Sequence, residues 1–292
     1  MSAKELLSIG IVAGIDTLEV ISDESKADLS VLPFVRTKSK LRLSDNRYQY
    51  VLNPDKCNGN RTILTVSEYY QVYDTMIEKM QLNRPNLSRV DFRFDRYEGE
   101  YTDHLKLNTA LLLLLAQEYK CRNRYESTDL LTGEELTIRL QNKYFEAEYY
   151  NKNQQSPNEG ISSRLELRSK CLADGSDEVE ELEFWFIRIE KAVTGSKYKD
   201  LLKTINQYLL LRYENEKRTD PTIKPNEFLF EHRARIFSRS QLAELYAKFG
   251  YSNPDEAAKK FITRRNVETV SYSAIEKYIR HLRIAADTFI NS

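Results

Sequence analysis

The chain has few glycines and histidines, and each shortage excludes a class of protein. Only nine glycines occur in 292 residues, and neither GxxxxGK nor GxGxxG is present, which excludes the P-loop and Rossmann nucleotide-binding motifs. The three histidines, His104, His232 and His281, lie too far apart for HExxH, and no GxSxG occurs. A zinc-protease motif and a hydrolase nucleophile elbow are therefore absent. Any catalysis would have to depend on carboxylates and on the 19 tyrosines.

The chain also lacks a disulfide pattern, a surplus of charge and a long apolar run. Its three cysteines, Cys57, Cys121 and Cys171, are scattered without CxxC spacing, which is typical of a reducing cytoplasm. The 44 basic and 44 acidic side chains cancel, so binding of a polyanion must come from local patches. The longest apolar run, residues 110–116, is too short to cross a bilayer, and no signal-peptide cleavage site is evident. We therefore expect a mature cytoplasmic protein with no membrane partner.

Hydrophobic periodicity predicts a mixed fold of strands and helices. The predicted strand regions are 8–21, 40–43 with 48–52, 87–97, 136–140 with 143–152, and 161–170. The predicted helices are 65–80, which Ser67 can cap, 103–119, 179–192, 198–215, 238–249, 253–263 and 271–289. We predict an α/β protein of the α+β kind, with a mainly antiparallel central sheet and helices on one face in residues 1–220. An all-helical domain is expected in residues 227–292.

Three of the predicted strands carry charged side chains at every second position. Because successive side chains on a strand point to opposite faces, each of these strands has an apolar face and a charged face. The charged faces hold Asp91, Arg93 and Asp95 on the first strand, Glu146, Glu148, Tyr150 and Lys152 on the second, and Arg164, Glu166 and Arg168 on the third. If the three strands are neighbours in the sheet, all of these side chains share one surface.

The charged faces have two interpretations. An antiparallel sheet with one solvated face alternates in the same way, and opposite charges across strands form favourable pairs. Aspartate, however, is depleted in strands, so two aspartates on one short strand suggest a specific role. Several hard carboxylate oxygens suit Mg²⁺ or Mn²⁺. The candidate metal ligands are Asp91, Asp95, Glu146, Glu148 and Glu166.

Three segments together resemble a pattern of rolling-circle replication initiators. They are residues 88–95 (SRVDFRFD), 146–152 (EAEYYNK) and 163–168 (SRLELR). The similar proteins are initiators of Gram-positive plasmids, related relaxases of conjugative elements and, more loosely, replication proteins of filamentous phages. In that group a strand R-[VI]-D-x-x-x-D, a strand ending in Y-x-K and a strand R-x-E-L-R follow in this order. The histidine–hydrophobe–histidine motif of the wider superfamily is absent here, as it is in this subgroup.

The resemblance implies a DNA nicking and joining enzyme that acts on single-stranded or extruded origin DNA. In such an enzyme a metal held by acidic residues polarises the scissile phosphate. A tyrosine then attacks, leaving a 5′-phosphotyrosyl link and a free 3′-hydroxyl. Carried over residue by residue, the resemblance makes Asp91, Asp95 and Glu166 metal ligands, Tyr150 the nucleophile and Lys152 a phosphate stabiliser.

The identity of the nucleophile is open among Tyr144, Tyr149 and Tyr150, and two of them could act in succession. Strand parity favours Tyr150 over Tyr149, because only Tyr150 shares a face with the glutamates of its strand. Tyr149 is the second catalytic candidate. The basic side chains of the same faces, Arg93, Arg164 and Arg168, are candidate DNA contacts, and ion pairing with neighbouring carboxylates is the alternative role for them.

The C-terminal helices carry a local surplus of positive charge. From Glu231 onward, eleven Arg and Lys side chains exceed seven acidic ones by four. A short helix, a turn at Gly250 and a second helix are compatible with a helix-turn-helix that binds duplex DNA. The candidate contacts are Lys259, Lys260, Arg264 and Arg265. A helical cap with a solvated basic face, or a dimerisation element, is the alternative.

Three functional hypotheses follow. The first is a replication initiator or relaxase of a mobile element or phage, with a nicking domain and a helical domain that binds duplex DNA beside the nick. The second is a non-enzymatic DNA-binding regulator with a structural acidic face. The third is a metal-dependent nuclease that uses water instead of tyrosine. A helicase and a second copy of the chain are further candidate partners.

Overall fold

The computed structural model describes residues 10–23, 36–37, 47–126 and 137–291. Its centre is an eight-stranded sheet in the order β2-β3-β1-β4-β8-β7-β6-β5, in which neighbouring strands are antiparallel. The strands are β1 (Ile11–Asp23), β2 (Arg36–Thr37), β3 (Arg47–Leu52), β4 (Asn86–Arg96), β5 (Arg122–Glu126), β6 (Thr137–Gln141), β7 (Phe145–Tyr150) and β8 (Ser163–Lys170). The predicted strand at 40–43 lies outside the described residues. The antiparallel α+β fold predicted from the sequence is confirmed.

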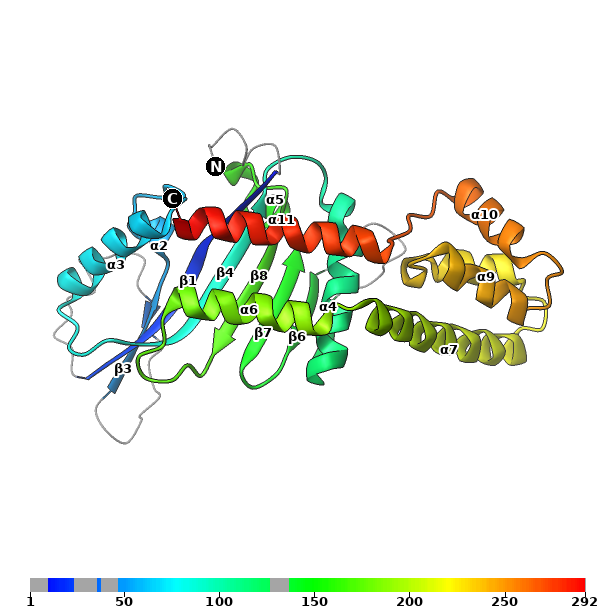
Figure 1. Ribbon diagram of the computed structural model, residues 1–292, viewed down its shortest axis with the longest axis horizontal. Helices are drawn as coiled ribbons and strands as arrows, with labels where there is room; N and C mark the ends of the chain where they lie inside the picture. Colours follow the sequence, from blue (N-terminus) through cyan, green and yellow to red (C-terminus); the bar gives the residue numbers. More distant parts are fainter. Residues whose placement is uncertain (1–9, 24–35, 38–46, 127–136, 292) are drawn as a thin grey trace.

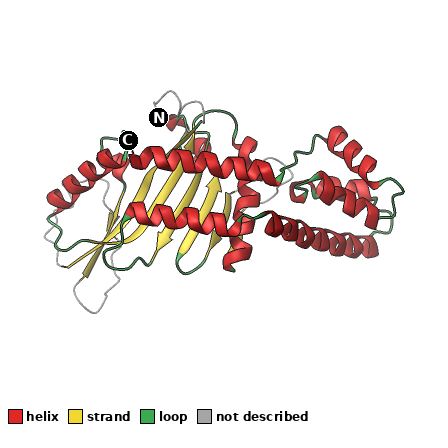
Figure 2. Cartoon of the chain, viewed as in Figure 1, coloured by secondary structure: helices red, strands yellow, loops and turns green. Residues whose placement is uncertain are grey.

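Helices pack on one face of the sheet, where α6 (Glu178–Ala192) and α11 (Tyr272–Asn291) cross the strands in Figure 1. Beside them lie α3 (Val66–Met80) and α4 (Leu105–Tyr119), and Figure 2 shows this helical layer over the strands. Aromatic side chains join the layers: the ring of Phe94 lies 6.3 Å from that of Phe186, and Phe145 lies 5.2 Å from Trp185. The apolar strand faces are therefore buried beneath the helices.

Polar side chains cap the first turns of two of the helices. The side chain of Thr65, not Ser67, accepts a hydrogen bond from the backbone of Glu68 and caps α3, so the predicted capping residue was wrong. At α9 (Arg239–Lys248), Ser238 and Gln241 form a capping box. The short helices α2 (Pro54–Cys57) and α5 (Lys152–Gln155) were not predicted, because four residues are too few for a periodic signal.

A second, smaller hydrophobic core lies in a helical lobe beside the sheet (Figure 1). The lobe contains the second half of α7 (Gly195–Thr219), then α8 (Pro225–Glu231), α9 and α10 (Pro254–Arg265). Tyr213 of α7 contacts the ring of Phe249 at 4.6 Å, and Tyr246 contacts Phe261 at 6.3 Å. The first half of α7 packs in the sheet core through Tyr198. One continuous helix thus connects the two cores.

The last helix does not belong to the helical lobe, although the sequence analysis placed it in a domain of residues 227–292. Ile275, Tyr278, Leu282 and Phe289 of α11 are buried in the core of the sheet. The Tyr278 hydroxyl also donates a hydrogen bond of 3.0 Å to Asn108 in α4. Amphipathic periodicity shows that a helix has a buried face but does not identify the core that buries it. The chain therefore leaves the sheet through α7 and returns to it through α11.

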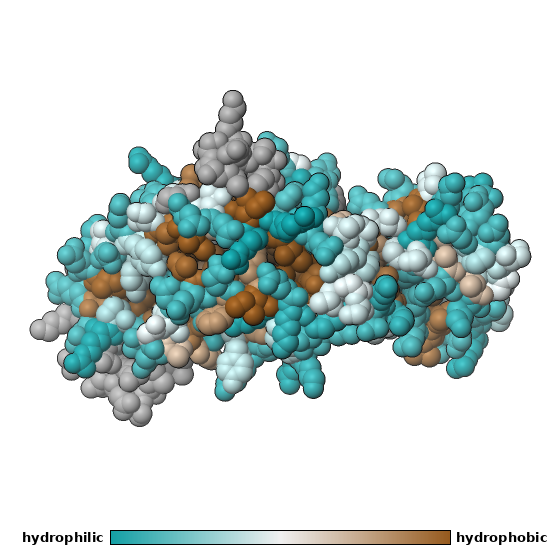
Figure 3. Space-filling view, in the orientation of Figure 1, coloured by the Kyte–Doolittle hydropathy of each residue, from teal (hydrophilic) through white to brown (hydrophobic). Residues whose placement is uncertain are grey.

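The outer surface of the helical layer is largely hydrophilic, with separate apolar patches over α6 and α11 (Figure 3). Two large apolar side chains of α6, Phe184 and Ile187, are exposed. Of the helices that the structure describes, none combines the length and hydrophobicity that crossing a membrane requires. The charged strand faces predicted from the sequence lie on the opposite side of the sheet from this layer.

His104, which precedes α4, is expected to make the fold sensitive to acid. Its ring packs 5.1 Å from that of Tyr278, and burial, then Arg96, lowers the pKa of His104 to about 4. Between pH 6.5 and pH 4 the unfolded chain therefore binds a proton that the folded chain does not, so stability falls as the pH decreases across this window.

His104→Gln should flatten the dependence of the free energy of unfolding on pH in this window, as measured by urea unfolding at pH 7.0, 6.0, 5.0 and 4.5. Burial also lowers the pKa of His281, so His281→Gln is the comparison variant and should flatten the profile less. Equal slopes in the two variants would contradict the assignment to His104.

Candidate active site on the polar face of the sheet

The three charged strand faces meet on one surface, because β4, β8 and β7 are neighbours in the sheet. Their register aligns the polar side chains in three rows across the strands. The first row is Asp91, Arg168 and Glu146; the second is Arg93, Glu166 and Glu148; the third is Asp95, Arg164 and Tyr150. The sequence predicted that these side chains and Lys152 would share a surface if the strands were adjacent, and the structure brings all of them except Lys152 into the rows. The prediction was wrong for Lys152, because β7 ends at Tyr150 and Lys152 begins the helix α5.

In the third row Arg164 forms a two-pronged ion pair with Asp95. Its Nε and Nη2 atoms donate to the two Asp95 carboxylate oxygens at 2.5 and 2.9 Å, and its Nη1 donates to Asp16 of β1. Asp95 and Arg164 are almost completely buried. Burial favours the neutral form of Asp16, but the Arg164 guanidinium, the Thr17 hydrogen bond and the charges of Arg93 and Lys152 together outweigh it and lower the pKa of Asp16.

Tyr150 and Glu166 form a buried hydrogen-bonded pair beside Arg164. The Tyr150 hydroxyl donates to Glu166 Oε1 at 2.5 Å, and the two residues are 5% and 8% exposed. Burial, and then the charge of Asp16, raise the pKa of Glu166 to about 7. Burial and the adjacent Glu166 also raise the pKa of Tyr150 above its ordinary value. A glutamate with a pKa close to neutral, bonded to a tyrosine hydroxyl, is arranged to accept the proton of that hydroxyl.

The first row is held by arginines on both sides. Arg89 Nε donates to Asp91 Oδ1 at 2.7 Å, and Arg168 Nε lies 2.9 Å from Asp91 Oδ2. Arg168 also pairs with Glu146, which Arg139 of β6 contacts at 2.5 Å. Each carboxylate of this row therefore contacts at least two cationic side chains.

An irregularity in β1 brings Asp16 to the polar face. The register between β1 and β4 shifts between Ile15 and Thr17, as at a β-bulge. Gly14 lies opposite Arg93 in the register, and a Cβ atom there would stand 2.9 Å from Arg93 Nε. Glycine at this position therefore leaves the space that the Arg93 guanidinium occupies.

Three acidic members of this network, Asp16, Glu19 and Asp55, were not predicted from the sequence. Asp55 lies in α2 and accepts a hydrogen bond of 3.1 Å from Arg93 Nη2. Asp16 could have been found, since an aspartate within a strand is as unusual there as in β4. Nothing local marks Asp55, because only the path of the chain after β3 brings α2 to this face.

The other candidate tyrosines lie apart from the network. Tyr149 belongs to the apolar face and is 2% exposed, and burial raises its pKa to about 12. Tyr144, which precedes β7, is 58% exposed and packs under Lys143. Of the three tyrosines, Tyr150 alone is bonded to a carboxylate of the polar face.

The candidate metal ligands are engaged with cations. Of the five predicted ligands, Asp91, Asp95, Glu146 and Glu166 each contact arginine. In the part of the chain that the structure describes, no three or more His, Cys, Asp and Glu side chains form a group that could hold a metal ion. The arrangement therefore does not fit Mg²⁺ or Mn²⁺, which need carboxylate oxygens free to coordinate. The metal stays a prediction from the sequence.

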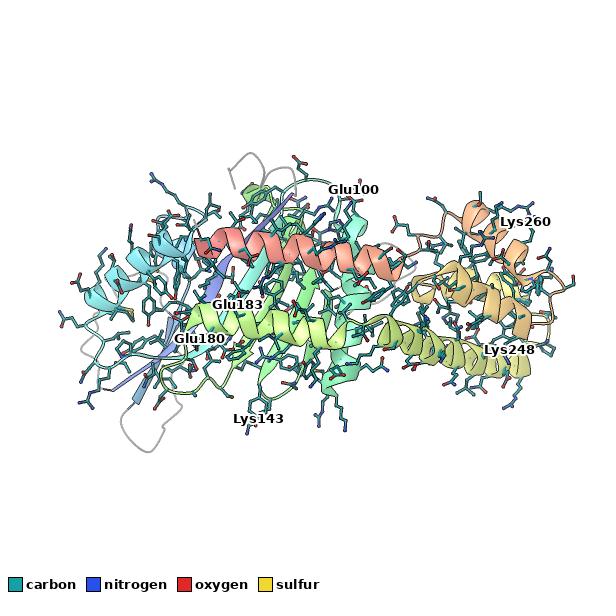
Figure 4. The ribbon with its side chains drawn as sticks, viewed as in Figure 1. Glu100, Lys143, Glu180, Glu183, Lys248 and Lys260 are labelled. Carbon is teal, nitrogen blue, oxygen red and sulfur yellow. The ribbon has the colours of Figure 1, made fainter. Side chains whose placement is uncertain are left out.

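The predicted DNA contacts divide into two groups. Arg93 and Arg164 are 2% exposed, and Arg168 is held in ion pairs, so none of the three is free to contact DNA in this arrangement. The four basic residues of α10, in contrast, are exposed: Lys259, Lys260, Arg264 and Arg265. Lys260 is labelled on the lobe in Figure 4.

Comparisons with known proteins give a distant structural likeness. No family model matches the chain, and no curated protein does. Among solved structures, the chain is similar to a rolling-circle replication initiator protein from Geobacillus stearothermophilus, with 14% sequence identity and a TM-score of 0.32. The match covers 55% of this chain and 75% of that one. A likeness at this level has no weight for function, which depends on the residues of the polar face.

Proposed function

We propose that this chain is a DNA nicking and joining enzyme of the rolling-circle initiator and relaxase kind, with Tyr150 as its nucleophile. The observation that carries the proposal is the bond from the Tyr150 hydroxyl to Glu166, with Arg164 opposite Tyr150 in the strand register. These three residues come from two of the three segments that resemble the initiators, and Lys152 follows Tyr150 by two positions.

The chemistry is a phosphoryl transfer from one oxygen to another. The Tyr150 oxygen forms a bond to phosphorus as its proton passes to Glu166, and the bond from phosphorus to the 3′-oxygen breaks. That oxygen leaves as a 3′-hydroxyl after taking a proton from water, and the 5′-phosphate stays on Tyr150. Rejoining is the same step in reverse. The raised pKa of Glu166 makes it a stronger base than an ordinary glutamate, and a cation such as Lys152 would offset charge on the phosphate.

Burial of the site supports a second candidate function. Tyr150 is 5% exposed, so DNA reaches its hydroxyl only after a local rearrangement. A buried network in which carboxylates and guanidinium groups pair is also what a purely structural sheet face would contain. The alternative is therefore a DNA-binding regulator without catalysis. The water-dependent nuclease has less support, because its metal lacks free ligands on this face.

The helical lobe is proposed to bind duplex DNA through α10. The helices α9 and α10 pack together through Tyr246 and Phe261, and the basic side chains of α10 are exposed. One of them, Arg265, also lies over the ring of Phe230 in α8 at 4.9 Å. This is the arrangement expected of a helix-turn-helix whose second helix contacts DNA.

Replacing Lys259 or Lys260 with alanine should weaken binding to duplex DNA. Each lysine that pairs with a phosphate releases about one counterion, so each substitution should reduce the slope of log affinity against log salt by about one. Fluorescence anisotropy with a labelled duplex between 50 and 300 mM salt measures the slope. Lys248→Ala is the control, because Lys248 is an exposed lysine of the same lobe that lies on its other side in Figure 4. Equal slopes for all variants would contradict a DNA contact at α10.

The nicking proposal is tested by covalent capture on single-stranded DNA. The protein is incubated with a 3′-labelled library that carries a randomised central segment, with Mg²⁺, with Mn²⁺ and with EDTA, and is then denatured. The 3′ label stays with the 5′-phosphotyrosyl fragment, so the expected result is a labelled protein band whose DNA can be sequenced. DNA binding without an adduct or cleavage would support the regulator, and cleavage without an adduct would support the nuclease.

A further inference from the structure

The polar face contains almost equal numbers of acidic and basic groups in direct contact. The acidic groups are Asp16, Glu19, Asp55, Asp91, Asp95, Glu146 and Glu166, and each contacts an arginine or lysine. The basic groups are Arg89, Arg93, Arg139, Arg164, Arg168 and Lys170. Glu148 of the second row and Lys152 bring the totals to eight acids and seven cations. A divalent cation is attracted to a surplus of negative charge, and these numbers leave almost none.

The guanidinium groups occupy the positions that a metal would need. Arg164 lies between Asp95 and Asp16, with its Nη1 3.8 Å from Glu166 Oε1. Arg168 lies among Asp91, Glu146 and Glu166. Each arginine therefore contacts three carboxylates, as a bound cation would. A buried guanidinium that lost these partners would be an uncompensated charge, so the pairs resist displacement by a metal ion.

Lys152 is held less firmly than the arginines of the polar face. Lys152 pairs with Glu159 at 3.4 Å, and the Glu159 side chain is 47% exposed. A pair of this kind contributes little to stability and exchanges readily with solvent. Lys152, which follows Tyr150 by two positions, is itself 14% exposed, and its half-exposed partner makes it the cation of this region that is most easily released to a DNA phosphate.

We infer that the polar face works without a divalent metal: Arg164 and Arg168 hold its carboxylates, and Lys152 provides the positive charge for the phosphate. The catalytic part of this inference rests on the proposed nicking function, whereas the part about metal binding does not. It differs from the expectation drawn from the sequence, in which Asp91, Asp95 and Glu166 bind Mg²⁺ or Mn²⁺.

Mn²⁺ binding tests the inference independently of catalysis. The full chain, stripped of metal, is titrated with Mn²⁺, and the free ion is followed by electron paramagnetic resonance. Arg168→Gln is titrated in parallel, because it leaves Asp91, Glu146 and Glu166 short of one cation. Removal of a unit charge a few ångströms away should raise the affinity for Mn²⁺ by at least about tenfold. Equal or tighter binding by the wild type would overturn the inference. Circular dichroism confirms that the variant is folded.

The capture assay adds the catalytic test. Tyr150-dependent adduct formation should be the same in EDTA and in Mn²⁺, and Lys152→Gln should reduce its rate whereas Lys143→Gln, at the exposed lysine labelled in Figure 4, should not. A loss of more than about tenfold in EDTA would overturn the inference. If no adduct forms under any condition, the proposed function fails instead, and the Mn²⁺ titration alone decides whether the face binds metal.

Discussion

Tyr150→Phe is expected to abolish the covalent adduct between the protein and single-stranded DNA. The substitution removes the one oxygen that forms the bond to phosphorus, and loss of a nucleophile lowers the rate by about a thousandfold or more. The measurement is the labelled protein band of the capture assay, compared at equal protein concentration.

Two tyrosine variants serve as controls for Tyr150→Phe. Tyr144→Phe removes an exposed hydroxyl outside the network, and Tyr149→Phe removes a buried hydroxyl on the opposite face of the same strand. Both should retain the adduct. A variant that loses the adduct only because it unfolds is recognised by its thermal melting curve. An adduct of normal yield in Tyr150→Phe would show that the nucleophile is a different residue.

Arg164→Met is expected to destabilise the fold by about 3–5 kcal/mol, because it leaves the buried Asp95 without its main partner. Asp95 is 0% exposed and accepts two hydrogen bonds from Arg164, and Asp16 loses its ion pair in the same variant. Methionine fills much of the volume, so the loss comes mainly from the uncompensated charge. The free energy of unfolding is measured by urea denaturation at pH 7.

The matched control for Arg164→Met is Arg212→Met on α7. Arg212 pairs with Glu216 at 3.2 Å, but its side chain is 51% exposed. Loss of an exposed pair should cost less than about 1 kcal/mol. Similar losses in the two variants would show that the buried network contributes no more to stability than a surface pair.

Much of the sheet could be predicted from local sequence. Alternating side chains identified β4, β7 and β8, and they assigned Asp91, Glu146 and the other charged residues to one face. The same parity separated Tyr150 from Tyr149, and the structure places these two side chains on opposite faces. Period-two alternation is a property of the strand itself, so it can be recognised before the strand order is known.

The partners of the charged groups could not be predicted in the same way. Which carboxylate meets which cation depends on register and on strand order, and both are set by packing over the whole sheet. Asp16 reaches the network through an irregularity in β1, and Asp55 reaches it from a short helix. The sequence showed the acids and the arginines of these faces but not which of them would pair, so a metal site and a set of ion pairs were both consistent with it.

Local sequence and tertiary structure determine different features of this protein for a physical reason. By itself, the sequence indicated most of the strands and the long helices, the charged face of each strand and the parity that separates Tyr150 from Tyr149, because these depend on residues within a few positions of one another. Only the tertiary structure decided that α11 returns to the sheet and that Glu166 accepts the Tyr150 hydrogen bond. It also decided that guanidinium groups surround the carboxylates. These outcomes depend on contacts between segments far apart in the chain, and no local pattern of residues records such contacts.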